Sequence, residues 1–190
     1  AHTDFVANAS HELRTPLASI IGYLETLTDE DEKVDAKTAR KFHETVLREA
    51  RRLQALVSDL MSLSRVEAEK HDPPAALLDL AKLTRNAAND AAGGAGTDRV
   101  VVEGTDTEAL IKGDRQQLEQ LVRNLIDNAL KYGDPAQPVT VSVSAEHGGR
   151  ARLTVTDRGE GIAAEHIPHL TRRFYRTDPG RSRAAGGTGL

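Results

Sequence analysis

The first part of the chain has the apolar spacing of a helix that packs along a narrow seam. Apolar side chains recur at intervals of four, three, four and three residues, at Leu13, Leu17, Ile20, Leu24 and Leu27. This heptad spacing is typical of helices that lie side by side in bundles. The pattern predicts one long helix over residues 5–27.

A second long helix is predicted over residues 35–68, after a charged connector at residues 28–33. Its apolar side consists of Phe42, Val46, Leu53, Leu56, Leu60 and Leu63. Two such helices form an antiparallel hairpin, which cannot bury both apolar seams by itself. Dimerisation into a four-helix bundle would bury them, so we expect a homodimer.

The pattern changes at Pro73 and Pro74, because consecutive prolines break a helix and mark a boundary. Beyond them, the pattern predicts helices over residues 80–92 and 114–132, and strands over 100–103, 109–111, 139–144 and 152–157. Gly148 and Gly149 predict a hairpin between the last two strands. The second half is therefore expected to be α+β, a mostly antiparallel sheet with helices on one face.

Composition narrows the class of protein. The 190 residues are 38% hydrophobic and 28% charged, which is typical of a globular chain. A net charge of −4 gives no electrostatic basis for binding nucleic acid, and the absence of cysteine excludes disulfides and thiolate metal sites. No apolar run approaches the roughly 18 residues that span a bilayer. The chain begins directly in an amphipathic helical pattern and stops inside a Gly-rich segment, so we expect a fragment of a longer protein.

One histidine in the first helix has neighbours that could serve chemistry. His11 stands beside the carboxylate of Glu12 and four residues before the hydroxyl of Thr15, and Pro16 follows at once. His11 lies about 200° around the helix from the seam residue Leu13, so it should point to solvent, with Thr15 on the same face. Alone, the same pattern also fits an ordinary amphipathic helix with a proline kink.

A polar stripe is predicted on the helix over residues 114–132. Asn124, Asn128 and Lys131 fall within roughly 60° of one another. Two amide oxygens and one ammonium group on a stripe could bind Mg²⁺ and the phosphates that it carries. The alternative is a solvated face opposite Leu121, Leu125 and Ala129. Asparagine is a poor residue inside a helix, and two of them one turn apart favour a function.

Two glycine-containing segments could bind a nucleotide. Asp157, Gly159 and Gly161 form an Asp-x-Gly-x-Gly motif after a predicted strand. The carboxylate could accept from an exocyclic amine such as that of adenine, and the glycines allow a ligand close to the backbone. The alternative is a plain turn. Gly187 and Gly189 belong to a Gly-rich segment that could contact phosphates through N–H groups or serve as a linker.

Together, these motifs resemble those of the sensor histidine kinases of two-component signalling, in order and spacing, over nearly the whole chain. The matching segments are residues 10–17 (phosphoacceptor motif), 124–132 (N box), 157–161 (first glycine box), 173–176 (aromatic box) and 186–190 (start of the second glycine box). The first of these is also similar to sensors of the phosphate-regulon type.

The resemblance implies a multidomain α and α+β fold. A dimerisation and histidine-phosphotransfer domain is expected over residues 1–70, and a linker over 71–78. Residues 79–190 would form the catalytic ATP-binding domain, an α/β sandwich with the ATPase fold shared with gyrase and Hsp90. This domain is expected to be incomplete at its C-terminus. The parent protein is expected to be membrane-anchored, with this part in the cytoplasm of a bacterium.

The resemblance also implies a role for each site residue. His11 would attack the γ-phosphate of ATP, and Glu12 would accept a hydrogen bond from its Nδ1–H. Asn128 would be the Mg²⁺ ligand, Asp157 would read adenine, and Arg176 would neutralise the transferring phosphoryl group. The other residues that it places at the nucleotide are Asn124, Lys131, Tyr132, Gly159, Gly161, Arg173, Gly187 and Gly189.

The partners follow from the same resemblance. His11 would pass its phosphate to an aspartate on the receiver domain of a response regulator. The spacing of Glu12 and Thr15 is similar to that of family members that also dephosphorylate this regulator, with the Thr hydroxyl positioning a water. The alternative is that Thr15 simply precedes a proline. A basic stretch of the second helix, with Arg48, Arg51 and Arg52, would face the receiver.

One motif departs from the family. Residues 171–174 read Thr-Arg-Arg-Phe, where the aromatic box commonly reads Phe-Glu-Arg-Phe. The change predicts weaker anchoring of this segment. Two other functions stay open on the sequence alone: an enzyme of the same ATPase fold that hydrolyses ATP or phosphorylates serine, and a dimeric scaffold with a degenerate ATP domain.

Overall fold

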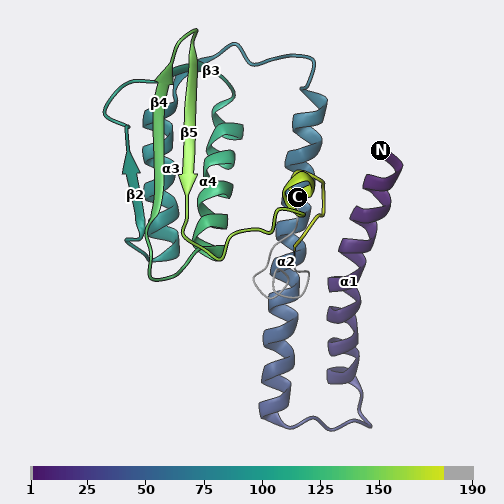
Figure 1. The fold of residues 1–190 in the computed structure, drawn as a ribbon. Coiled ribbons are helices and arrows are strands. Elements are labelled where there is room, and N and C mark those ends of the chain that lie inside the picture. Colours follow the sequence, from purple (N-terminus) through teal and green to yellow (C-terminus); the bar gives the residue numbers. More distant parts are fainter. Residues whose placement is uncertain (1, 178–190) are drawn as a thin grey trace. The chain divides into compact units, whose positions relative to one another are not determined.

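The computed structural model describes residues 2–177, which divide into two compact units (Figure 1). One unit contains the described residues up to Lys70 together with those from Ala163 onward, and the other contains His71–Ile162. No helix in the described part of the chain is both long enough and apolar enough to cross a membrane.

The first unit is built on an antiparallel helical hairpin. Helix α1 spans His2–Thr28 and helix α2 spans Ala36–Ala68, and they lie side by side (Figure 1). Asp35 caps α2 by accepting a hydrogen bond from the Thr38 N–H at 2.8 Å. Tyr23 and Phe42 join the two helices in an edge-to-face contact, with ring centroids 4.9 Å apart. The predicted hairpin is confirmed.

Each helix covers only part of the other's apolar seam. Leu13, Ile20 and Leu27 of α1 are half-buried, whereas Leu17 and Leu24 of the same seam are 46% and 41% exposed. Helix α2 leaves a similar row exposed, consisting of Leu47, Val57, Met61 and Val66. A hairpin with uncovered apolar rows on both helices has a surface suited to a further partner.

The second unit has helices on one side of a three-stranded sheet. In chain order, it contains β1 (Leu77–Asp79), α3 (Leu80–Ala95), β2 (Val100–Glu103), β3 (Leu110–Lys112), α4 (Arg115–Tyr132), β4 (Val139–Glu146) and β5 (Arg150–Thr156). The sheet order is β2-β4-β5, and α3 and α4 lie against it (Figure 1). Buried side chains of β4 alternate at Val139, Val141 and Val143, and they pack with Leu83, Val122 and Ile126 of the helices.

Two features of the sheet differ from the sequence expectation. Strand β2 pairs with β4 in parallel, and only β4 and β5 form the predicted antiparallel hairpin. A separate two-stranded sheet joins β1 to β3, and β1 was not predicted. Two of the three strand pairs are antiparallel, as expected, but the strands form two sheets and not one, and the three-stranded sheet is mixed.

Helix α3 is longer than predicted. It continues through Gly93 and Gly94 to Ala95, and Gly96 ends it in a left-handed conformation with φ 61°. Only this last glycine has the geometry of a helix C-cap. Helix α4 matches the prediction, with Asp114 accepting from the Gln117 N–H at 2.8 Å at its start.

Asp79 connects α3 to the small sheet. Its Oδ1 accepts from the N–H groups of Ala109 and Ala81, each at 3.0 Å. The bond from Ala109, more than that from Ala81, holds the pKa of the Asp79 carboxyl below its ordinary value of 3.8. The folded chain therefore binds this proton less readily than the unfolded chain. The resulting stability is complete above the ordinary pKa and is lost as pH falls through the folded pKa.

Replacing Asp79 with asparagine should lower the free energy of unfolding at pH 7 by about 1 kcal/mol, because a charged helix cap becomes neutral. The difference from wild type should shrink as pH falls below about 4. Urea unfolding between pH 7 and pH 3 measures it. Asp106→Asn, at an exposed aspartate, controls for the loss of one carboxylate. A difference that stays constant with pH would contradict the assignment.

Candidate functional site

The first group of site residues lies on α1. His11 is exposed, as its angle from the seam predicted. Pro16 is fully buried five residues later and has no N–H to donate to the carbonyl one turn before it. Thr15 donates its hydroxyl to the His11 carbonyl at 3.2 Å. The predicted acceptor histidine is therefore exposed. Thr15 and Pro16 alter the backbone hydrogen bonds of the helical turn that follows it.

The carboxylate of Glu12 has arginine neighbours. Its Oε2 lies 3.7 Å from a guanidinium nitrogen of Arg52 on α2 and 4.0 Å from one of Arg176. The Arg176 side chain is only 8% exposed. The resemblance to the family implies a hydrogen bond from His11 Nδ1–H to Glu12, and this stays a prediction. In the structure, the charge of Glu12 is balanced by these two guanidinium groups, of which sequence spacing gave no sign.

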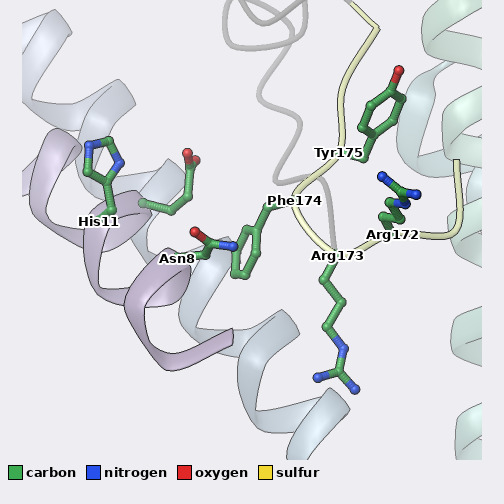
Figure 2. A pocket seen from close by; sticks show the side chains of 7 residues that line it. Asn8, His11, Arg172, Arg173, Phe174 and Tyr175 are labelled. Carbon is green, nitrogen blue, oxygen red and sulfur yellow. The ribbon is translucent and has the colours of Figure 1, made fainter. Parts of the chain in front are cut away.

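A segment far along the sequence belongs to the same unit as α1. A pocket of about 300 Å³ is lined by Asn8, His11, Glu12 and residues 172–175. Figure 2 shows Asn8 and His11 extending from the helix, with Phe174 and Tyr175 carried by the facing segment. Phe174 has φ 63°, which is uncommon for a bulky residue, and its ring stacks on Phe5 with centroids 6.1 Å apart.

Arg173 fixes this segment to both helices of the hairpin. Its guanidinium pairs with the carboxylate of Glu67 on α2 and lies 4.7 Å from the centre of the Phe5 ring on α1. Figure 2 shows its side chain extending away from His11. The structure therefore groups Arg173 and Arg176 with His11 and Glu12, in the unit that does not contain Asn128.

The second group of site residues lies on α4. Asn124, Asn128 and Lys131 are exposed, and Tyr132 is 41% exposed. The buried face of α4 is formed by Val122, Ile126 and Ala129. Three residues were expected opposite the polar stripe as the apolar face. Of these, Ala129 is buried, whereas Leu121 and Leu125 are 47% and 39% exposed. The polar stripe is available to a ligand.

The loop after β5 meets the end of α4. Asp157 follows β5 directly, and its Oδ1 accepts from the Gly159 N–H at 2.8 Å. A Cβ on Gly159 would lie 2.6 Å from the Tyr132 carbonyl oxygen, so no other residue fits there without movement. Gly161 has φ 75°, which glycine adopts readily. The structure thus brings the predicted adenine-reading loop beside the predicted metal-binding helix.

Sequence reasoning missed one glycine at this junction. Gly133 caps α4, and a Cβ there would lie 2.5 Å from the Ala129 carbonyl oxygen and 3.1 Å from Asp157 Cβ. The sequence pattern predicted only that the helix ends at residue 132, directly before this glycine. Gly187 and Gly189, which were also predicted to bind the nucleotide, lie outside the described residues.

The donor atoms on α4 fit a magnesium–nucleotide complex. Mg²⁺ in nucleotide sites takes one or two protein oxygen ligands and completes its shell with phosphates and water. Asn128 offers an exposed amide oxygen, and Lys131 offers an ammonium group one turn away for phosphate. These residues would hold the metal and its phosphates, and the metal would supply charge neutralisation at the phosphates.

Two protein-family models match the chain. Residues 1–69 match the His Kinase A (phospho-acceptor) domain. Residues 113–190 match the Histidine kinase-, DNA gyrase B-, and HSP90-like ATPase. The second family binds ATP, so an ATP-binding domain follows a phosphoacceptor domain.

Named relatives agree with these two matches. The phosphate regulon sensor protein PhoR of Pseudomonas aeruginosa is 39% identical over 98% of this chain and 42% of its own length. The sensor histidine kinase TrcS of Mycobacterium tuberculosis is 41% identical over 98% of this chain and 37% of its own length. The chain thus spans less than half the length of these two relatives.

A solved structure has the same fold. The histidine kinase AdeS of Acinetobacter baumannii superposes with a TM-score of 0.61 at 29% identity, covering 82% of this chain and 76% of that one. Domain order, relatives and fold agree with the motifs found in the sequence. The chain therefore belongs to the sensor histidine kinases of two-component systems and has the protein histidine kinase core of that family.

Proposed function

We propose that this chain phosphorylates its own His11 with Mg·ATP and passes the phosphoryl group to an aspartate of a response regulator. One observation carries the proposal: an exposed histidine within a phosphoacceptor domain is followed in the same chain by an ATPase-type domain with exposed Asn128 beside the Asp157 loop. Neither half alone would suffice, since one supplies the nucleophile and the other the phosphate donor.

The phosphoryl transfer is a substitution at phosphorus. The lone pair of His11 Nε2 forms the N–P bond, the bond from the γ-phosphorus to the bridging oxygen breaks, and ADP leaves. The Nδ1 proton then passes to a base, for which Glu12 is the nearest residue in sequence. Glu12 would have to leave Arg52 and Arg176 first, since its carboxylate lies 3.7 Å and 4.0 Å from them. Arg176, beside Glu12, is suitably charged to neutralise the phosphoryl group.

Asp157 and the α4 stripe would hold the nucleotide in this proposal. One oxygen of Asp157 accepts from the Gly159 N–H, and the carboxylate would accept from an exocyclic amine of the base. Asn128 and Asn124 would arrange Mg²⁺, and Lys131 would bind phosphate. Tyr132 would pack near the base, and Gly159 and Gly161 would let the base come close to the backbone. Arg173 would act indirectly, by holding its segment through Glu67 and Phe5.

Dimerisation and regulator binding would use the hairpin. The exposed apolar rows of α1 and α2, which include Leu17, Leu24 and Met61, are suited to a second copy of the chain. The receiver domain would contact the exposed part of α1 near His11 and the basic stretch of α2. The parent protein would be membrane-anchored, with this core in the cytoplasm.

The direct test is a time course of phosphate incorporation from γ-labelled ATP. The wild-type chain should incorporate label in the presence of Mg²⁺ and should lose most incorporation when EDTA is added. Transfer of the label to a purified receiver domain should follow within the same assay. Release of inorganic phosphate without any labelled chain would favour a simple ATPase and contradict the proposal.

Thr15 is proposed to assist the reverse reaction. Its hydroxyl donates to the His11 carbonyl at 3.2 Å, and rotation about χ1 would free it to orient a water against a receiver's aspartyl phosphate. Thr15→Ala should slow dephosphorylation of the regulator by at least about tenfold and leave phosphorylation of His11 within about twofold.

Thr15→Ser is the matched control, because it keeps the hydroxyl. It should retain most of the dephosphorylation rate, measured as loss of label from the phosphorylated regulator. If Thr15→Ala and Thr15→Ser dephosphorylate the regulator equally well, the hydroxyl has no such role.

A further inference from the structure

Arg99 makes several hydrogen bonds to the backbone at the end of α4. Its Nε donates to the Gln137 carbonyl at 3.1 Å, and its two terminal nitrogens donate to the carbonyls of Asp134 at 2.8 Å and Leu130 at 3.5 Å. Its own carbonyl accepts from the Val139 N–H at 2.8 Å, where β2 and β4 begin to pair. One side chain therefore joins the last turn of α4 to the loop that follows it.

The charge and shape of a guanidinium suit this position. The carbonyls at a helix C-terminus have no partners within the helix and carry partial negative charge, which a cation stabilises. A guanidinium presents several donors in one rigid plane, so it can bind several carbonyls at once. A flexible ammonium group would reach fewer of them. The arrangement fixes the position of the backbone between residues 130 and 137.

The same loop is bonded to the segment that carries Asp157. The Asp134 carbonyl accepts from Arg99, while the Asp134 N–H donates to the Arg158 carbonyl at 3.3 Å. Gly133, one residue earlier, lies against Asp157, where an added Cβ would be 3.1 Å from Asp157 Cβ. Arg99 is thus connected to the loop after β5 through the backbone of one residue, Asp134.

We propose that Arg99 is a positioning residue for adenine recognition. It holds the end of α4 and, through Asp134, the loop that carries Asp157, so that the carboxylate stays in place to accept from the exocyclic amine of adenine. This inference rests on the proposed function, in which Asp157 reads adenine. Arg99 does not touch the nucleotide in this account, and its effect reaches the site through the Asp134 backbone.

A purely structural role would also make Arg99 variants less stable, so the test uses base selectivity. Inosine triphosphate differs from ATP in carrying a carbonyl where adenine has its exocyclic amine. Displacing Asp157 should weaken the binding of ATP more than that of inosine triphosphate. The ratio of the two dissociation constants is a property of folded molecules, and partial unfolding does not change it.

The experiment measures both dissociation constants by calorimetry, with Mg²⁺ present, on the 190-residue wild-type chain and its Arg99→Ala and Arg99→Lys variants. Arg99→Ala should weaken ATP binding about tenfold and reduce the selectivity for ATP at least about threefold. Arg99→Lys should fall between wild type and Arg99→Ala, and it keeps the test available if the alanine variant does not fold. Val143→Ala is the control, because it truncates a buried side chain further along β4.

Selectivity that is unchanged in both Arg99 variants would overturn the inference. So would an equal loss of selectivity in Val143→Ala, since that would show a general effect of lowered stability. A wild-type chain that fails to bind Mg·ATP would instead overturn the proposed function, and this inference with it. Wild-type binding without any preference for ATP would leave the kinase proposal intact and overturn the role given to Asp157 and Arg99.

Discussion

Replacing His11 with glutamine is expected to remove all phosphate that the chain incorporates from ATP. Glutamine is similar in size and polarity but has no ring nitrogen with a nucleophilic lone pair. The position is exposed on α1, so the substitution should leave the free energy of unfolding nearly unchanged. Phosphate incorporation from γ-labelled ATP should vanish. Binding of unlabelled ATP, measured separately, should stay at the wild-type level.

His43→Gln is the matched control, because His43 is also exposed and helical but lies on α2. This variant should incorporate phosphate at the wild-type rate. Label that persists in His11→Gln at more than a few per cent of the wild-type level would show that another residue is the acceptor. Ser10, the adjacent hydroxyl, would then be the first residue to examine.

Replacing Asn128 with alanine is expected to lower the rate of phosphate incorporation about 100-fold or more. The substitution removes the amide oxygen that is proposed to hold Mg²⁺ at the phosphates, and electrostatic stabilisation is the main contribution of a protein to phosphoryl transfer. The side chain is exposed and lies opposite the buried Ile126, so the fold should be retained. Rates measured against Mg²⁺ concentration should show a higher requirement for the metal.

Asn89→Ala provides the comparison for losing an exposed helical asparagine, since Asn89 lies on α3. It should behave as wild type. If Asn128→Ala incorporates phosphate at the wild-type rate and with the wild-type Mg²⁺ requirement, then the polar stripe of α4 is only a solvated face. The sequence alone had left that alternative open.

The helices and most of the strands could be predicted from the sequence, whereas strand β1 and the way in which the strands pair outside the hairpin of β4 and β5 could not. The repeated leucines of α1 and α2 and the alternating valines of β4 predicted these three elements to within about three residues at each end. Strand β1 has only three residues, and its pairing with β3 depends on contacts distant in sequence. The parallel pairing of β2 with β4 likewise depends on α4 crossing between them, which a local pattern does not contain.

The motifs located the candidate site, but spacing could not supply its partners. His11 and the exposed stripe of α4 were placed by helical angle alone. The neighbours of Glu12 are Arg52 and Arg176, which are 40 and 164 residues away in sequence. Arg99 reads in the sequence as an ordinary charge before a strand, because its partners are backbone carbonyls, which have no sequence signature.

The chemical stability of the incorporated phosphate tests the central claim most directly. The wild-type chain would be labelled with γ-labelled Mg·ATP, and two samples would be treated with acid and with alkali. A further sample would be digested so that the labelled peptide can be identified. Phosphohistidine is labile in acid and stable in alkali, whereas phosphoserine and phosphothreonine survive acid. The account predicts a label that is lost in acid, kept in alkali, and located on the peptide that contains His11. A label that survives acid, or one that maps to a peptide without His11, would contradict it.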